Sequence, residues 1–371
     1  MSSYTDLDTP ERILLGPGPS MVHPRVLRAL AQPLVGHLDP QFLAIMSEVQ
    51  GLLRFVFQTT NELTIPVSGT GSAGMEAALC NFIEPGDEVL IGVNGYFGER
   101  LCDMAARYGA SVRRLEKAWG AVFQPEEIEA ELRKKPARLV GLVHAETSTG
   151  ALQPMEDMAN VVHRYGALLL MDCVTSLGGV PVKVDEWGVD IAYSGTQKCL
   201  SCPPGLAPLT VNQRAREAMH QRTTQVKNWY LDLTMVERYW GSARTYHHTA
   251  PISMNYALRE ALRLVHEEGL EARFARHRLH AEMLWQGLEE FGFAMHVPLA
   301  YRLPTLTTPC VPEAISEKEV RARLLADYNV EIAGGLGVLA GKVWRIGLMG
   351  YSSRRENVTL LLAALKELVN R

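Results

Sequence analysis

The sequence has few cysteines and no excess of charge of either sign. Six cysteines occur in 371 residues, far below the density of a disulfide scaffold. The 37 basic and 41 acidic side chains give a formal net charge of −4, which leaves no basic surface for nucleic acid. No run approaches the roughly 18 apolar residues of a membrane span, and the N-terminus lacks the charged and apolar regions of a signal peptide. We therefore expect a cytoplasmic protein with reduced thiols and neither nucleic-acid nor membrane partners.

Two short patterns resemble metal or redox motifs. Cys199 and Cys202 have C-x-x-C spacing, but no second ligand pair follows at a zinc-like distance, and the pair lies in a predicted loop. His247 and His248 are adjacent, and successive side chains on a strand or loop point apart. We therefore predict no metal site.

Apolar periodicity predicts an α/β fold with two domains. Residues 20–255 alternate short apolar runs with amphipathic ones, which is typical of a mostly parallel sheet covered by helices. We place a large domain there and a smaller C-terminal α/β domain at 256–371, with residues 1–19 packing on it or on a partner subunit. The large domain is predicted to have seven strands, at 63–67, 88–93, 111–115, 139–144, 167–171, 191–194 and 207–211, with helices at 72–81, 98–108, 125–135 and 155–165. The second domain is predicted to have a long helical stretch at 254–291, helices at 316–327 and 355–369, and strands near 293–296, 305–310, 330–332 and 343–346.

A lysine and an aspartate occupy positions that suggest chemistry. Lys198 lies in a turn of small residues between an apolar run and a loop rich in proline and glycine. Asp172 ends a wholly apolar run, as a carboxylate at the end of a buried parallel strand would. In pyridoxal-phosphate enzymes a lysine amine condenses with the cofactor aldehyde, and an aspartate keeps the pyridine nitrogen protonated. The alternative for Asp172 is a helix N-cap or a solvated charge, and for Lys198 an ordinary amine beside a loop.

A glycine-rich segment predicts a phosphate cradle. Thr70, Gly71 and Ser72 follow an apolar strand and open a helix, where free backbone N–H groups and the helix dipole attract an anion. The same segment spells G-x-G-x-x-G, so a dinucleotide-binding domain is the alternative. The next strand ends in Asn94 and Gly95 without the carboxylate that a ribose would need, which favours a single phosphate.

Two further residues have a functional and a structural interpretation. Phe97 lies in the loop after the next strand, where its ring is either a stacking surface for a cofactor or an ordinary core side chain. Arg345 lies inside an apolar run, and burying it is costly unless it meets a carboxylate. That carboxylate belongs either to a substrate or to a structural salt bridge.

Taken together, these motifs resemble one family along nearly the whole chain. The chain is similar to the fold-type I, class V aminotransferases, and most closely to those of the alanine:glyoxylate (serine:pyruvate) type. The resemblance rests on the order and spacing of seven segments, at 15–20, 68–72, 144–150, 171–176, 194–198, 246–249 and 344–347.

The resemblance implies a role for each matching residue. It implies pyridoxal 5'-phosphate as cofactor, bound covalently by Lys198, with Asp172 at the ring nitrogen and Phe97 stacked on the ring. It implies that Arg345 holds the substrate α-carboxylate and that the active site is shared across a homodimer. The other residues it implies are Val174 on the second ring face, Thr147 near the phenolic oxygen, Gln197 as a cofactor hydrogen-bond partner, Gly18 at the substrate, and Tyr246 and Thr249 reaching the phosphate from the partner subunit.

The activity expected on this basis is transamination of a small amino acid, alanine or serine, with a 2-keto acid, glyoxylate or pyruvate. Aminotransferases acting on ureidoglycine or phosphonate amines are alternatives within the same class. A cysteine desulfurase fits less well, because Gln197 stands where a histidine is expected and Cys310 has prolines close on both sides instead of a glycine-rich loop. A non-catalytic nucleotide-binding module is the alternative from a different class.

Overall fold

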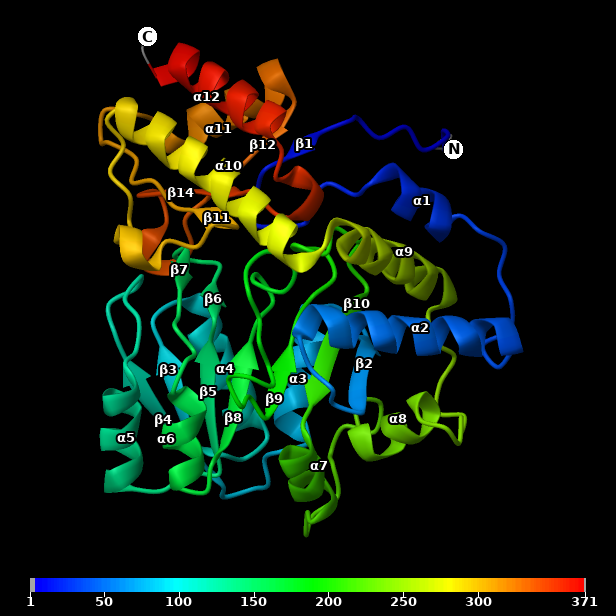
Figure 1. The fold of residues 1–371 in the computed structure, drawn as a ribbon. Coiled ribbons are helices and arrows are strands. Elements are labelled where there is room, and N and C mark those ends of the chain that lie inside the picture. The colour runs from blue at the N-terminus through cyan, green and yellow to red at the C-terminus, as the bar shows by residue number, and fades with distance from the viewer. Residues whose placement is uncertain (1–3, 370–371) are drawn as a thin grey trace.

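The computed structural model describes residues 4–369 and is built around one large sheet, with the C-terminal part of the chain stacked above one edge of it (Figure 1). The predicted seven-stranded, mostly parallel sheet is confirmed. Only β10 runs antiparallel to its neighbours. The strand order is β2 (Leu63–Ser68), β10 (Leu206–Val211), β9 (Ile191–Tyr193), β8 (Leu168–Asp172), β5 (Leu139–Val143), β3 (Glu88–Val93) and β4 (Ser111–Glu116).

Helices cover this sheet, and its central strands are apolar for that reason. Every residue of β5 and β8 is buried, as expected of parallel strands packed on both faces. The predicted helices over 72–81, 98–108, 125–135 and 155–165 are present with shifted ends. The helices of this part are α1 (Pro24–Leu30), α2 (Pro40–Phe57), α3 (Gly71–Cys80), α4 (Tyr96–Arg107), α5 (Pro125–Lys134), α6 (Met158–Arg164), α7 (Gln213–His220) and α8 (Leu233–Trp240).

The helical stretch predicted over 254–291 is two helices, α9 (Ile252–Glu268) and α10 (Leu270–Glu290). Gly269 separates them with a φ of 78°, which a residue with a side chain rarely adopts. Helix α9 packs on α1 and α2, and its apolar residues belong to the core beneath the large sheet. We therefore propose that the boundary between the two domains lies at Gly269 and not at residue 255.

The C-terminal part has a small sheet and an apolar core of its own. Strand β14 (Trp344–Gly347) lies between β11 (Leu306–Thr307) and β13 (Ala333–Gly334), and α11 (Glu317–Tyr328) and α12 (Arg355–Val369) pack together. The strand predicted near 293–296 is wrong, because only an isolated bridge joins Met295 to Pro309. The N-terminal strand β1 (Ile13–Leu14) pairs in parallel with β12 (Val330–Glu331), beside the C-terminal helices (Figure 1).

The carboxyl ends of the parallel strands meet at the edge of the large sheet that faces the C-terminal part (Figure 1). The short hairpin of β6 (Ala145–Glu146) and β7 (Ala151–Leu152) extends from this edge, and Thr305 donates a hydrogen bond across it to the Thr175 carbonyl at 2.9 Å. Ligands of open α/β sheets bind at this edge. Within residues 4–369, no helix is long and apolar enough to span a bilayer.

Candidate active site

Lys198 lies in the loop between β9 and β10, with a half-buried side chain. Its Nζ donates a hydrogen bond to the Pro17 carbonyl. Burial, and next the positive charge of Arg345, lower the pKa of the Lys198 amine to about 8. About a tenth of the amine is therefore neutral at pH 7, far more than for an ordinary lysine, and the neutral form is the nucleophile and base.

Asp172 ends strand β8 and is 2% exposed. Its Oδ1 accepts the Val174 N–H at 2.9 Å, and its Oδ2 accepts the Tyr193 hydroxyl at 2.6 Å. Burial raises the pKa of the Asp172 carboxyl, while these hydrogen bonds and Lys198 oppose that rise. The Asp172 carboxylate is thus held in one orientation in the protein interior. Because the dielectric constant there is low, its attraction to a cationic group is strong.

Sequence reasoning missed Tyr193. The residue stands opposite Asp172 in the register of β8 and β9, and its hydroxyl is what orients the carboxylate. The available signal was that Tyr193 ends the strand before the lysine loop, next to a strand that ends in an aspartate.

The glycine-rich segment forms the start of α3, as predicted. Thr70 is the N-cap, and its side chain makes no capping hydrogen bond. A Cβ on Gly71 would lie 3.5 Å from Val174 Cγ2 and 3.6 Å from Gly195 Cα, so the helix start is packed against the Asp172 and Lys198 loops. Ser72 Oγ accepts a hydrogen bond from Arg100 Nη1 at 3.3 Å. This arrangement leaves backbone N–H groups free for a phosphate.

Phe97 is held in the site by a buried acid that the sequence did not single out. The Phe97 N–H donates to Glu146 Oε2 at 3.1 Å, and Glu146 Oε1 accepts the N–H and hydroxyl of Ser148 at 2.9 and 2.6 Å. Glu146 is fully buried, which raises the pKa of its carboxyl. Phe97 lies at the start of helix α4 and not in a loop as predicted, and Glu146 connects this helix start to the loop that carries Thr147.

Arg345 and Thr147 are brought together from different parts of the chain. Arg345, on β14, is 7% exposed and donates to the Gly334 carbonyl at 2.8 Å and to the Thr147 carbonyl at 3.4 Å. No acidic side chain of residues 4–369 forms an ion pair with it, so the structural salt bridge has no partner there. Burial lowers the pKa of the guanidinium to about 10. The nearby Glu146 charge opposes that fall without forming an ion pair, and a buried guanidinium without an ion pair is suited to a ligand carboxylate.

Gly18 and Gln197 adjoin the lysine. Gly18 has a φ of 108°, and a Cβ there would lie 2.6 Å from Lys198 Cδ, so its contact is with the lysine chain. The Gln197 side-chain oxygen is buried and has no hydrogen-bond partner among the described residues. An orphaned buried oxygen of this kind indicates a ligand group that donates to it.

Tyr246 and Thr249 lie apart from the residues described above. Both are exposed, and the Tyr246 ring lies 5.2 Å from the ring of His37. The expectation that His247 and His248 point apart is wrong, since their Nδ1 atoms lie 2.8 Å apart where the loop turns. His248 Nε2 also lies 2.8 Å from Ser68 Oγ, just before the cradle. Across residues 4–369, no group of three or more His, Cys, Asp or Glu side chains is arranged to hold a metal ion.

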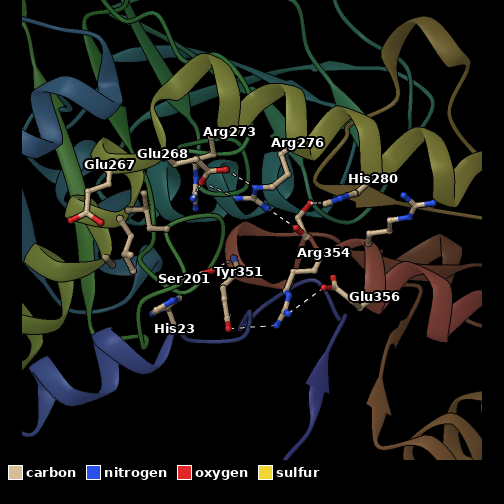
Figure 2. Close-up of a pocket in the computed structure, with 15 residues that line it drawn as sticks. His23, Ser201, Glu267, Glu268, Arg273, Arg276, His280, Tyr351, Arg354 and Glu356 are labelled. Carbon is tan, nitrogen blue, oxygen red and sulfur yellow. Dashed lines mark hydrogen bonds and ion pairs between the residues drawn. The ribbon is translucent and has the colours of Figure 1, made fainter.

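A separate cavity of about 620 Å³ is lined in part by Leu200 and Ser201, which follow Lys198 in its loop, and Figure 2 shows its polar lining. The Ser201 hydroxyl lies 3.1 Å from that of Ser20, which in turn donates to the Lys198 carbonyl at 2.7 Å. Its most buried cations, Arg273 and Arg276, are neutralised by Glu268 and by backbone carbonyls (Figure 2). None of the predicted site residues lines this cavity.

Comparison with known proteins identifies the family. The model of the class V aminotransferases matches residues 14–361. The chain belongs to this family. Among curated proteins it is 44% identical to (S)-ureidoglycine-glyoxylate transaminase of Bacillus subtilis, covering 100% of this chain and 94% of the relative. It is 42% identical to alanine-glyoxylate aminotransferase of Rattus norvegicus, covering 97% and 88%.

Solved structures of class V aminotransferases agree with this assignment. Alanine-glyoxylate aminotransferase from Nostoc sp. is 56% identical with a TM-score of 0.98, covering 99% of this chain and 98% of that one. Ureidoglycine-glyoxylate aminotransferase from Bacillus subtilis is 46% identical with a TM-score of 0.97, covering 99% and 95%. The protein is thus a pyridoxal-phosphate-dependent aminotransferase, and the G-x-G-x-x-G segment belongs to this fold and not to a dinucleotide-binding module.

The residues present fit the cofactor. The start of α3 offers N–H groups to a phosphate, Asp172 offers a buried carboxylate to a ring nitrogen, and Lys198 offers an amine of lowered pKa to an aldehyde. The unpartnered Gln197 oxygen can accept a hydrogen bond from a ligand in the same place.

Proposed function

We propose that this aminotransferase moves an amino group from a small amino acid, alanine or serine, to glyoxylate or pyruvate. The observation that carries the proposal is Arg345, a buried guanidinium without an ion pair among residues 4–369, whose charge also acts on Lys198. A guanidinium in that place matches a substrate with a carboxylate. Both named groups of relatives include glyoxylate in their names, which supports glyoxylate as an acceptor.

A second candidate donor is (S)-ureidoglycine. Its support is the Bacillus subtilis relative, which at 44% identity is about as similar to this chain as the alanine-glyoxylate aminotransferase of Rattus norvegicus at 42%. The choice of amino donor rests on pocket contacts of about 1 to 3 kcal/mol each. Few residues of the pocket are therefore needed to favour one donor over the other.

Each residue of the site has a proposed task in this reaction. Pyridoxal phosphate, when bound, supplies an electron sink that makes the substrate α-proton acidic. Lys198 Nζ would hold the cofactor and, once the substrate amine has displaced it, would carry the proton from the substrate α-carbon to C4′ of the cofactor. Asp172, oriented by Tyr193, holds the ring nitrogen in its protonated form. Arg345 fixes the substrate carboxylate so that the α C–H bond has one orientation.

Other residues hold the cofactor in this proposal. Thr70, Gly71 and Ser72 bind the phosphate, Phe97 and Val174 cover the two ring faces, and Gln197 and Thr147 donate or accept at the ring substituents. Gly18 keeps space for the lysine chain. These assignments follow from the positions described above together with the family match.

The proposal includes a homodimer with shared active sites. Its support is a set of exposed aromatic side chains: Trp229 and Tyr230, 57% and 42% exposed, lie against His247, and Tyr246, in the segment next to it, is 57% exposed. Exposed apolar clusters of this kind mark protein contacts. In a two-fold dimer, Tyr246 and Thr249 of one subunit would reach the phosphate of the other.

Mixed dimers test the shared site. A Lys198→Ala chain and a Tyr246→Ala chain are each expected to be nearly inactive. When they are unfolded together and refolded, a shared site regains activity, because one site of each mixed dimer combines an intact lysine with an intact tyrosine. No regain, with mixed dimers demonstrated by mass, would contradict sharing.

The activity itself is tested with the purified protein and its cofactor. We expect a yellow protein whose visible band is fixed and bleached by borohydride through Lys198, and whose band is lost on adding alanine or serine. Lys198→Ala should fold and dimerise but lose transamination, since it removes a nucleophile and not a packing group. Turnover of alanine and glyoxylate by Lys198→Ala at the wild-type rate would overturn the assignment. A panel with (S)-ureidoglycine then distinguishes the two donors.

We also propose a cytoplasmic location. All six cysteines are free thiols, which is typical of proteins kept in a reducing compartment.

A further inference from the structure

Arg100 is a cation at the cradle that none of the assignments above uses. It lies on α4, one turn after Phe97. Its Nη1 lies 3.3 Å from Ser72 Oγ, and its guanidinium lies over the rings of Phe97 and Tyr96, 4.8 and 5.3 Å from their centroids. The aromatic faces and the serine hydroxyl thus direct one charged group at the start of α3.

This guanidinium has no acidic partner. None of the ion pairs within residues 4–369 includes Arg100, and its neighbour Glu99 is turned towards Arg114 at 3.9 Å. A half-buried arginine is usually paired, whereas Arg100 forms no ion pair among residues 4–369, although its charge acts on the Asp172 carboxyl.

The cradle, for its part, lacks any other positive charge. Thr70, Gly71 and Ser72 are neutral. The nearest histidine, His248, has a pKa lowered to about 4 by burial, so it is neutral at pH 7. A phosphate monoester carries a charge of about −1.5 to −2 at that pH. Backbone N–H groups and hydroxyls alone would have to hold that charge.

We propose that Arg100 binds the cofactor phosphate together with Ser72, supplying the positive charge that the cradle lacks. Its place on α4 gives it a second effect: the helix that presents the Phe97 ring also supplies the cation for the phosphate. Ring and phosphate are then positioned by one rigid element. The charge also acts on the rest of the site, since Arg100 opposes the burial-driven rise in the pKa of the Asp172 carboxyl and adds to the burial-driven fall in the pKa of Lys198. The inference rests on the proposed phosphate cradle.

The test compares pyridoxal 5'-phosphate with pyridoxal, which lacks the phosphate. Both are titrated into the apoenzyme, and binding is followed by the visible band of the lysine-bound form. We expect Arg100→Gln to weaken pyridoxal 5'-phosphate at least tenfold and pyridoxal less than twofold, because only the phosphate contact is lost. Arg100→Lys should recover part of the loss. Arg107→Gln, on the same helix and exposed, is the matched control and should bind both compounds normally.

Inorganic phosphate supplies a second measurement. It should compete with pyridoxal 5'-phosphate for wild-type apoenzyme and compete at least tenfold less well for Arg100→Gln. Equal weakening of pyridoxal and pyridoxal 5'-phosphate, or no weakening of either, would overturn the role of Arg100. If the wild-type apoenzyme itself does not prefer the phosphorylated compound, the cradle is wrong as well. If Arg100→Gln does not fold, the same titrations with Arg100→Lys decide, and an unchanged preference for the phosphate then counts against the proposal.

Discussion

Replacing Gly18 by alanine should lower the stability of the folded protein and, by a separate cause, its affinity for the cofactor. Gly18 has a φ of 108°, and a Cβ there would lie 2.6 Å from Cδ and 2.7 Å from Nζ of Lys198. The backbone conformation costs a residue with a Cβ about 1–3 kcal/mol, with or without cofactor. The cost of the clash with Lys198, in contrast, depends on the cofactor. The end of the Lys198 side chain is flexible and is free to move away only while no cofactor is bonded to it.

The size of the effect on the cofactor follows from this difference. In the apoenzyme, Lys198 turns away from the new methyl group at little cost. Once the Lys198 amine is bonded to the cofactor, the side chain can no longer turn away from the methyl group. Its torsions are then held away from their preferred rotamers, which costs about 1.4–2.8 kcal/mol. The upper part of that range requires two strained torsions. A tenfold change in affinity corresponds to 1.4 kcal/mol, so we expect pyridoxal 5'-phosphate to bind about 10- to 100-fold more weakly.

Gly16→Ala is the matched control in the same loop. A Cβ there would meet only Glu331 Oε1 at 4.0 Å, and Gly16 is not among the residues of positive φ. Spectrophotometric titration of each apoenzyme with pyridoxal 5'-phosphate, with thermal unfolding of the same samples, gives both quantities. The reasoning is refuted if Gly18→Ala titrates like wild type, or if Gly16→Ala loses as much affinity.

Four further outcomes are expected. Asp172→Asn should still bind cofactor but slow α-proton removal in single turnovers by about 100-fold or more, and unchanged rates would remove its role. Arg345→Lys should weaken alanine, serine, glyoxylate and pyruvate alike, by about tenfold, with a normal visible band; loss of cofactor with normal acid binding would make Arg345 structural. Because the pKa of Lys198 is about 8, capture of cofactor by the apoenzyme should speed up with pH until about pH 8 and then level off; a flat profile from pH 6 to 9 would contradict this. Burial lowers the pKa of His144 from 6.5 to about 3. The contribution of His144 to stability is therefore complete above pH 6.5 and falls by about 1.4 kcal/mol per pH unit as pH drops towards 3. Urea unfolding at pH 7 and pH 5 should show that His144→Gln loses less stability on acidification than the wild type, and an equal loss in both would contradict this.

Residues at the ends of strands were the ones that sequence reasoning identified. Asp172 and Lys198 each follow a short apolar run, and parallel strands bring such ends to one edge of a sheet. Tyr193 and Glu146 were missed because their roles come from side chains meeting across loops and strand registers. A one-dimensional pattern contains no information on that packing.

The same limit applies to the fold. Seven strands and most helices follow from apolar periodicity, whereas the division of 254–291 into two helices depends on one glycine, Gly269, whose φ of 78° is a property of the folded backbone. Arg100 is similar, since an arginine on an amphipathic helix looks like a solvated charge until its missing counter-charge is seen.

The segment that follows the N-terminal strand is hydrogen-bonded both to the strand that carries Arg345 and to Lys198. Leu15 donates to the Glu331 carbonyl at 2.8 Å and accepts from the Gly347 N–H at 2.8 Å, and Gly347 ends the strand that carries Arg345. Two residues later, the Pro17 carbonyl accepts the Lys198 amine. The short segment from Leu15 to Pro17 therefore joins the strand that carries Arg345 to the carbonyl that accepts the Lys198 amine, so we expect the positions of these two side chains to depend on each other.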